Sequence, residues 1–221
     1  KALPGQLGVF QIADAAGNSL RFTLDAGGER VKEDTQDASG TLLRTLSRTY
    51  DTLGRLQAQA DAQHRATTFG YDADDNLQLT TDALGRKTAN TYDPLGRLKT
   101  TLQDVGGIAA QTQYRYDALD NLTRIIDANG LPTAYTYNGF GDVLTLDSPD
   151  TGIATSTYDA AGNLKTRTDA RGITATYGYD LLDRLTSASF PDNSLNASFR
   201  YDTAPAECPA GERHAIGRLA A

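Results

Sequence analysis

The sequence predicts an all-β fold, an antiparallel meander of repeated β-hairpins. A Tyr-Asp pair recurs along the chain, most often every 21 residues and twice at longer steps of 24 and 22. A fixed period of this size indicates an array of one supersecondary unit, whose copies must stack to bury their apolar faces. Apolar and polar residues also alternate between turn signals, and no run of ten or more residues combines helical period with helix caps. The pairs are Tyr50-Asp51, Tyr71-Asp72, Tyr92-Asp93, Tyr116-Asp117, Tyr158-Asp159, Tyr179-Asp180 and Tyr201-Asp202, with Tyr137-Asn138 in the remaining slot.

Each repeat contains two turn signatures. The first reads Tyr-Asp-x-x-Gly-Arg/Asn-Leu, as in residues 50–56, 92–98 and 158–164. The second opens with Asp-x-x-Gly, as in residues 82–85 and 127–130. Asp at the first position can hydrogen-bond its own backbone two residues on, and Gly at the fourth supplies a positive φ without a Cβ clash. We therefore expect turns, several with positive φ, at Gly54, Gly85, Gly96, Gly130, Gly141, Gly162 and Gly172.

Five to seven residues lie between successive turns and alternate as in a half-buried strand, which predicts about sixteen short strands. In residues 98–103 the alternation places Leu98, Thr100 and Leu102 on one face and the intervening residues on the other. The leucine and isoleucine side chains expected on the more apolar face of the sheet are Leu98, Leu102, Ile126, Leu144 and Leu146.

The repeats predict one array over residues 1–221, made of three stretches. Residues 1–49 are divergent repeats, residues 50–202 are clear repeats of about 21 residues, and residues 203–221 are an irregular loop and the start of a further repeat. We expect an internal fragment of a longer protein whose flanking repeats continue the sheet. The exposed sheet edges of such a fragment favour self-association with another copy.

Composition excludes several classes of function. The net charge of −7 is spread over the repeats and argues against nucleic-acid binding, which needs a basic stripe. No segment has eighteen consecutive apolar residues, so membrane insertion is not expected. Cys208 is the single cysteine and has no partner for an internal disulfide, so sheet packing must supply the stability.

The motifs that resemble catalytic or metal sites are better explained as turns. Residues 150–152 match the Asp-Thr-Gly of aspartic proteases, but they fill a turn slot and have no second copy. Residues 72–76 open like a calcium loop, but the Gly and Glu that such a loop requires at its sixth and twelfth positions are missing. His64 stands in a turn slot, and the spacing of Cys208 and His214 is weak evidence for a nucleophile pair. The sequence therefore predicts no catalytic, cofactor-binding or metal-binding residue, and no enzyme.

The repeated tyrosines allow two interpretations. Tyrosine can pack between strands as a ladder of cross-strand pairs, which is the simpler interpretation. Its ring also has an apolar face and a polar hydroxyl, a combination that suits sugar stacking. The residues that would form a carbohydrate-binding surface are Tyr135, Tyr137, Tyr177 and Tyr179.

The repeat unit resembles the YD repeat of the RHS (rearrangement hotspot) family. Residues 114–116, 135–137 and 177–179 carry the doubled Tyr-x-Tyr of that pattern ahead of the turn. The resemblance covers about residues 50–201 well and the two ends loosely. It implies a long β-sheet that spirals into a hollow shell, as in teneurins and insecticidal toxin-complex subunits. Residues 93–96 are similar to part of the family's self-cleavage motif, but they lie in an ordinary repeat turn, so the resemblance assigns no catalytic residue here.

In bacterial polymorphic toxins of this family the shell encloses a C-terminal toxin domain. The resemblance therefore implies a secreted or cell-surface protein that serves bacterial competition, with the encapsulated toxin of the parent as its partner. About sixteen strands spaced by about 4.8 Å give a strip of about 75 Å, whereas a shell around a 100-residue cargo needs a circumference of about 140 Å. The chain alone would be a wall segment. The alternatives are a carbohydrate-binding adhesin array and, least favoured, a polysaccharide-cleaving enzyme, which would need two carboxylates across a cleft.

Overall fold

The computed structural model describes residues 8–201 and 219–220, and within them the fold is all-β. Strands β1 to β18 belong to one antiparallel sheet, and β19 pairs with β20 in a separate two-stranded sheet. The described residues contain no α-helix, and their one helical element is the short 3-10 turn η1 (Asn193–Leu195). The chain divides into two compact units, Lys1–Thr112 and Gln113–Ala221. The all-β antiparallel meander predicted by the repeat is confirmed, whereas its division at residues 49 and 202 stays a prediction.

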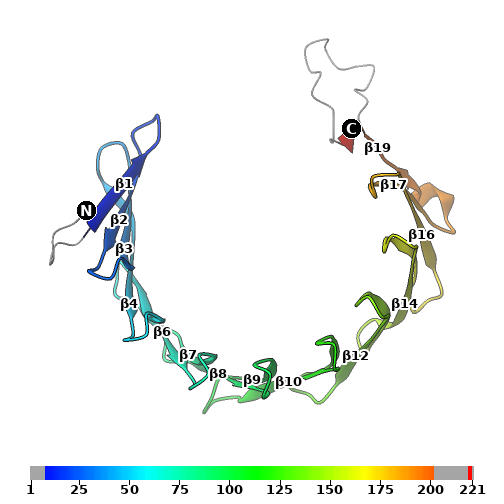
Figure 1. Cartoon of the computed structure of the whole chain (residues 1–221), viewed down its shortest axis with the longest axis horizontal. Helices are drawn as coiled ribbons and strands as arrows, with labels where there is room; N and C mark the ends of the chain where they lie inside the picture. The colour runs from blue at the N-terminus through cyan, green and yellow to red at the C-terminus, as the bar shows by residue number, and fades with distance from the viewer. Residues whose placement is uncertain (1–7, 202–218, 221) are drawn as a thin grey trace, which may run out of the picture. The chain divides into compact units, whose positions relative to one another are not determined.

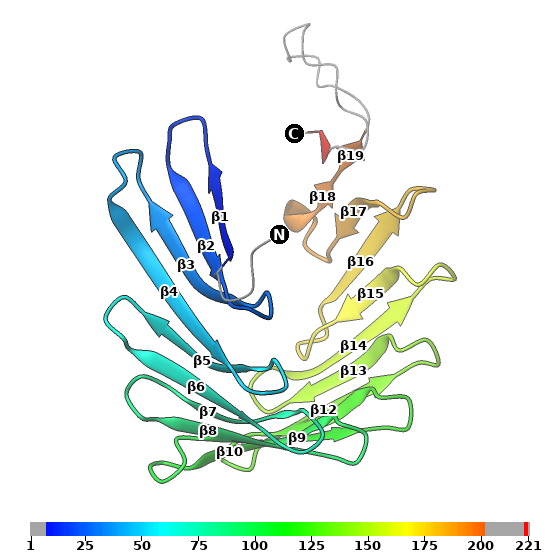
Figure 2. The same ribbon diagram turned by 60° about the vertical axis from the view of Figure 1, so that its left-hand side comes forward.

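In the first unit each strand pairs with the next one along the chain (Figures 1 and 2). This order follows from short connections between neighbouring strands, which favour antiparallel hairpins. The strands are β1 (Gly8–Ala13), β2 (Ser19–Leu24), β3 (Arg30–Gln36), β4 (Leu42–Tyr50), β5 (Leu56–Asp61), β6 (Ala66–Tyr71), β7 (Leu77–Thr81), β8 (Lys87–Tyr92) and β9 (Leu98–Gln103).

The second unit continues in the same way, with each strand from β11 to β18 paired to the one before it. Strand β10 (Ala110–Tyr116) contains the boundary between the two units. The remaining strands are β11 (Leu122–Ile126), β12 (Pro132–Tyr137), β13 (Val143–Ser148), β14 (Gly152–Tyr158), β15 (Leu164–Thr168), β16 (Thr174–Tyr179), β17 (Leu185–Ser189), β18 (Ala197–Ser198), β19 (Arg200–Tyr201) and β20 (Leu219–Ala220).

The turn after each Tyr is built around its aspartate. At Asp93 the backbone N–H of Gly96 donates to the Asp93 carbonyl, and the Asp93 N–H donates to the Arg97 carbonyl, each at 2.9 Å. The carboxylate adds two more bonds, accepting from the N–H of Leu95 at 2.9 Å and of Arg97 at 3.0 Å. The fourth residue is left-handed, which fits a hairpin loop that ends in a G1 bulge. The prediction of positive φ is confirmed at Gly54, Gly85, Gly96, Gly130, Gly141, Gly162 and Gly172, with φ from 75° to 87°.

A β-bulge follows the turn after each Tyr, from Tyr50 to Tyr179, and changes the predicted faces. The register pairs Tyr92 with Leu98 and Thr91 with Thr100, so Lys99 is an extra residue on β9. Because Tyr92 and Thr91 are adjacent and face opposite ways, Leu98 lies on the tyrosine side and Thr100 on the other side. The expectation that Leu98, Thr100 and Leu102 share a face was wrong. The sequence alternation alone does not reveal the inserted residue.

The bulges give the sheet two chemically different faces. The tyrosine face carries the Tyr that ends the strand before each Tyr-Asp turn. Leu146 lies on the same face, opposite Tyr135. The threonine face carries hydroxyl pairs across neighbouring strands, at 2.7 Å for Thr91 and Thr100 and at 2.6 Å for Thr136 and Thr145. The apolar set expected on one face is therefore divided: Leu98 and Leu146 lie on the tyrosine face, whereas Leu102, opposite Ala89, and Ile126, opposite Gln113, lie on the threonine face.

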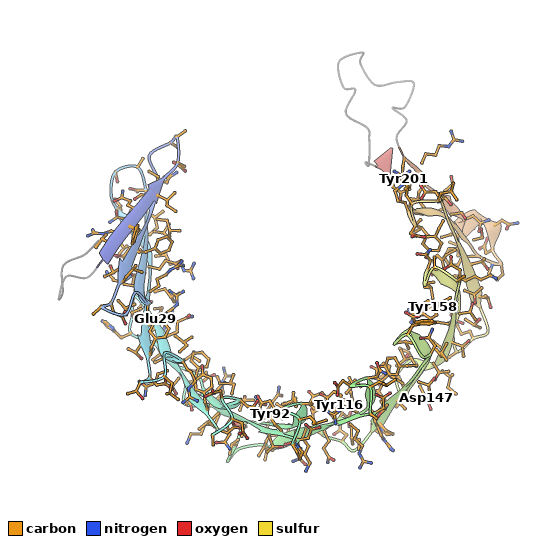
Figure 3. All side chains as sticks on the ribbon, in the orientation of Figure 1. Glu29, Tyr92, Tyr116, Asp147, Tyr158 and Tyr201 are labelled. Atoms are coloured by element: carbon orange, nitrogen blue, oxygen red, sulfur yellow. The ribbon has the colours of Figure 1, made fainter. Side chains whose placement is uncertain are left out.

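Neither unit has a conventional core. Among the described residues only Leu46, Ala175 and Ala188 are buried apolar side chains, and no large side chain is fully buried. Figure 3 shows side chains projecting from both faces of the strands within each unit. In such a single layer, stability is a sum of contacts within each repeat and between nearest neighbours.

The contact that joins neighbouring hairpins is a hydrogen bond from the Tyr hydroxyl to a backbone carbonyl of the preceding hairpin. Tyr92 donates to the Leu77 carbonyl at 2.8 Å, and Tyr137 donates to the Leu122 carbonyl at 2.7 Å. The same bond recurs at four further tyrosines, mostly with the carbonyl 15 residues earlier. These are Tyr71 to Leu56, Tyr158 to Val143, Tyr179 to Leu164 and Tyr201 to Leu185.

We expect Tyr137→Phe to lower the free energy of unfolding by about 1 kcal/mol, because the substitution removes the hydrogen bond to Leu122 and leaves the ring in place. Tyr135→Phe is the matched control, since within the described part of the chain the Tyr135 hydroxyl has no hydrogen-bond partner. Urea unfolding followed by circular dichroism measures both variants. Equal loss of stability in the two variants would show that the hydroxyl bond does not join the hairpins.

Self-association through strand edges stays a prediction, and β1 is the place to test it. Val9, Phe10 and Ile12 of β1 are 48%, 59% and 65% exposed. Phe10 and Ile12 lie on one face of the strand and Val9 on the other, and burial of exposed apolar side chains favours association. We expect the apparent mass by light scattering to rise with protein concentration, and Phe10→Lys with Ile12→Lys to reduce the rise. A monomeric mass at all concentrations would contradict the expectation.

Candidate functional site

The four tyrosines proposed for carbohydrate binding form two close pairs on β12 and β16. Tyr137 donates to the Leu122 carbonyl at 2.7 Å, and Tyr179 donates to the Leu164 carbonyl at 3.0 Å. Burial raises the pKa of Tyr137, and the nearby Tyr135 and Asp117 raise it further. The hydroxyls of Tyr137 and Tyr179 therefore stay protonated and donate hydrogen bonds within the sheet. Carbohydrate binding by Tyr135, Tyr137, Tyr177 and Tyr179 stays a prediction.

Most turns couple their aspartate to the residue four positions later. Arg97 Nε donates to Asp93 Oδ2 at 2.7 Å, and Arg184 Nε donates to Asp180 Oδ2 at 2.7 Å. Arg97 is the largest cause that lowers the pKa of the Asp93 carboxyl, while desolvation opposes it and the backbone N–H groups of Arg97 and Leu95 add to it. In each such turn the aspartate and the arginine thus form an ion pair with no net charge.

The same arginine also reaches the next repeat. The guanidinium of Arg55 lies over the Tyr71 ring, with Cζ 4.6 Å from the ring centroid, and the guanidinium of Arg184 lies over Tyr201 at the same distance. Arg55 Nη1 also pairs with Asp75 of the next turn at 2.5 Å. Cation–π stacking and the ion pair therefore hold successive turns in order along the sheet edge.

The repeat pattern alone did not predict this lateral pairing. Asp75 and Asp183 stand in the left-handed slot that is usually glycine, with φ of 66° and 58°. Asp75 bonds Arg55, and Asp183 Oδ1 accepts from the Asn163 amide at 2.7 Å, both across 20 residues. The available signal was the occurrence of Asp in a glycine slot 20 residues after an Arg or Asn.

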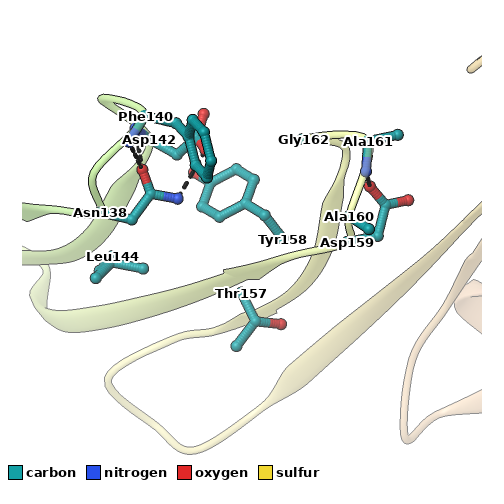
Figure 4. Close-up of a pocket in the computed structure, with 10 residues that line it drawn as sticks. All are labelled: Asn138, Phe140, Asp142, Leu144, Thr157, Tyr158, Asp159, Ala160, Ala161 and Gly162. Carbon is teal, nitrogen blue, oxygen red and sulfur yellow. Dashed lines mark hydrogen bonds between the residues drawn. The ribbon is translucent and has the colours of Figure 1, made fainter.

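One repeat departs from this arrangement and leaves a cavity. Asn138 replaces the turn aspartate, and Asp142 replaces the arginine four residues later, with the Asn138 amide donating to Asp142 Oδ2 at 2.8 Å. A cavity of about 520 Å³ lies between this turn and the next one, beside the Tyr158 ring (Figure 4). It is lined by Asn138, Phe140, Asp142, Leu144, Thr157, Tyr158, Asp159, Ala160, Ala161 and Gly162.

The other motifs that resemble catalytic or metal sites form turns where the structure describes them. Asp150 and Thr151 lie in the turn before β14, as expected. The Asp72 carboxylate accepts from the N–H groups of Asp74 and Asn76, like the other turn aspartates. His64 occupies a left-handed turn position with φ of 59°.

Cys208 and His214, together with the rest of residues 202–218, lie outside the described residues. Within the described ranges, no group of three or more His, Cys, Asp and Glu side chains is placed to hold a metal ion. No helix found there is long and apolar enough to cross a membrane.

Comparison with known families identifies the repeat. The model described as RHS Repeat matches residues 50–87, 71–109, 116–153 and 158–195, which together cover more than half of the chain. The chain belongs to the RHS repeat family. No curated protein sequence matches it.

Solved structures with the same fold come from Tc toxins. The crystal structure of TcdB2–TccC3–Cdc42 is similar with a TM-score of 0.68 at 18% identity, over 86% of this chain and 12% of that one. The Tc holotoxin pore of Photorhabdus luminescens gives a TM-score of 0.67 at 18% identity, again over 86% and 12%. This RHS repeat chain thus spans about an eighth of the length of those proteins, and at this identity the likeness concerns the fold.

We expect the RHS repeats to lose stability as the pH falls below about 4. Hydrogen bonds lower the pKa of turn carboxyls such as Asp93 and Asp169, so the unfolded chain binds more protons once the pH falls below the ordinary Asp value. The stabilisation is present above that pH and is lost as the pH falls through the folded-state values. Urea unfolding at pH 7 and pH 3 measures the difference.

Asp93→Asn supplies the control for this pH dependence. The Asn138 side chain accepts from the N–H of Phe140 at 2.9 Å and of Asp142 at 3.0 Å, so an amide oxygen builds the same turn. The variant should fold and show a shallower loss of stability with acid. An unfolding free energy that is equal at pH 7 and pH 3 would contradict the role assigned to the carboxylates.

Proposed function

We propose that the chain is a non-catalytic wall segment of an RHS shell that encloses a C-terminal toxin domain in its parent protein. The observation that best supports this proposal is the single-layer sheet. Within each unit the described strands form one layer with few buried side chains, and Tyr hydroxyls join neighbouring hairpins, as at Tyr92 and Tyr137. A layer of this kind separates two spaces and needs further repeats to close around a cargo.

The chemistry of the described residues supports a structural role. The recurring carboxylates, which a hydrolase would use in pairs, are bound to backbone N–H groups in their own turns, as at Asp51 and Asp159. Membership in the RHS family and the fold shared with TcdB2–TccC3 support the same role. A secreted or cell-surface protein acting in bacterial competition is the setting that we propose for the parent, with flanking repeats and the enclosed toxin as its partners.

We expect the domain that follows the repeats in the parent protein to resist added protease while the shell is intact. Tyr137→Ala together with Tyr179→Ala should open the wall, because both substitutions remove the ring and the bond to the preceding hairpin. Limited proteolysis followed by mass spectrometry gives the cleavage rate of that domain in each parent variant. Tyr135→Phe is the control that should leave protection unchanged. Equal cleavage of the domain inside the parent and in isolation would exclude enclosure.

A further inference from the structure

The cavity at Tyr158 occupies the place where Arg55 and Arg184 lie in two other repeats. Arg55 precedes Tyr71 by 16 residues and lies over its ring, and Asp142 precedes Tyr158 by the same 16 residues. The hydrogen bonds agree with this equivalence, because Tyr71 donates to the carbonyl of Leu56 and Tyr158 donates to the carbonyl of Val143. The Asp142 carboxylate therefore lies beside the Tyr158 ring, at the position that the Arg55 guanidinium has beside Tyr71.

The chain itself does not fill this position with a cation. Among the described residues that line the cavity none is Lys or Arg, and two of them, Asp142 and Asp159, are acidic. Within the described ranges the Asp142 carboxylate accepts one hydrogen bond, from the uncharged Asn138 amide. Asp142 is thus a half-buried carboxylate beside aromatic rings without an ion-pair partner.

A second repeat also has an acidic residue in this slot. Glu29 stands at the position equivalent to Asp142, and Tyr50 stands at the position equivalent to Tyr158. The cavity there, of about 400 Å³, is lined by two arginines of the same chain, Arg30 and Arg48. Both arginines form ion pairs with Glu33. Basic side chains of the chain thus line the cavity at Glu29, whereas no described residue that lines the cavity at Asp142 is Lys or Arg.

The aromatic lining of the Asp142 cavity suits a flat cation. Phe140 is 95% exposed at the tip of its turn, and its ring and the Tyr158 ring line the same cavity (Figure 4). Aromatic faces attract cations, and guanidinium stacks on them more readily than ammonium because it is planar and weakly hydrated. A carboxylate at the edge of the rings can then accept a charge-assisted hydrogen bond from the same group.

We propose that this cavity binds an arginine side chain presented by a basic segment of a partner polypeptide. The guanidinium would lie over Tyr158, as Arg55 lies over Tyr71, and would pair with Asp142, with Phe140 beside it. Charge complementarity favours such a partner, because the chain carries a net charge of −7. The proposal does not depend on whether the wall encloses a toxin.

The direct test is a titration of the whole chain with a short blocked Gly-Arg-Gly peptide, followed by the backbone amide NMR signals of Gly139, Gly141 and Gly162. We expect saturable shifts at these amides with the arginine peptide, and at least tenfold weaker binding with the citrulline peptide, which keeps the shape and loses the charge. The lysine peptide should also bind more weakly. Equal binding of the arginine and citrulline peptides, or of the arginine and lysine peptides, would overturn the proposal.

Asp142→Arg would test the equivalence with Arg55 inside the protein. The introduced guanidinium should stack on Tyr158, fill the cavity and abolish peptide binding. Asp147→Arg is the matched control, because it makes the same change of charge on β13 but on the opposite side of the sheet from Tyr158 (Figure 3). Peptide binding by this control should stay within twofold of the original protein. Equal loss in both variants would show that general electrostatics, and not the cavity, binds the peptide.

Asp142→Asn keeps the test valid if Asp142→Arg does not fold. Asparagine already occupies this turn position at Asn76, Asn121 and Asn163, so the variant is expected to fold. It should weaken binding of the arginine peptide at least fivefold while the unfolding transition stays in place. Undiminished binding, or saturable shifts of the same amides with a neutral oligosaccharide and none with the arginine peptide, would overturn the proposal.

Discussion

The bond between a tyrosine hydroxyl and a carbonyl of the preceding hairpin is the interaction on which the rest of this sheet depends. A single layer with only three buried apolar side chains among its described residues has little burial to keep one hairpin against the next. The ladder hydrogen bonds of a sheet permit several registers, whereas the bond from Tyr92 to Leu77 fits only one. Its repetition about every 21 residues converts a set of hairpins, each marginal alone, into an ordered array.

The bulge explains why tyrosine can make this bond. One extra residue after the turn that follows each Tyr, such as Lys99, places Leu98 beside Tyr92, and the same step recurs in the next such hairpin. The arginine before that leucine is then directed toward the next tyrosine ring, as Arg55 is toward Tyr71. The turn aspartate orients the arginine, so aspartate, arginine and tyrosine act as one unit that spans two repeats.

The sequence alone predicted the architecture and the turns, because both follow from local rules. An Asp-x-x-Gly turn needs only its own four residues, and so all seven glycines were placed correctly with positive φ. The division of Leu98 and Leu102 between the two faces was not predicted, because a bulge is a property of two paired strands and leaves period-two alternation intact in each strand taken alone. The hydroxyl bonds and the pairing of Arg55 with Asp75 were missed for the same reason, since their partners lie 15 to 20 residues apart.

In an array of this kind the regular repeat is explained by the fold. A residue that departs from the repeat therefore needs a separate explanation. Substitution of Arg by Asn at Asn76 or Asn121 removes the positive charge, but the side-chain amide still donates to the turn aspartate. Substitution by Asp at Asp142 introduces a charge at a half-buried position next to aromatic rings, where an unpaired charge is unfavourable. The Asn138 amide is the one hydrogen-bond donor to this carboxylate among the described residues, and a cationic ligand would compensate its charge. The cavity beside Tyr158 thus lies where this repeat departs from the regular sequence pattern.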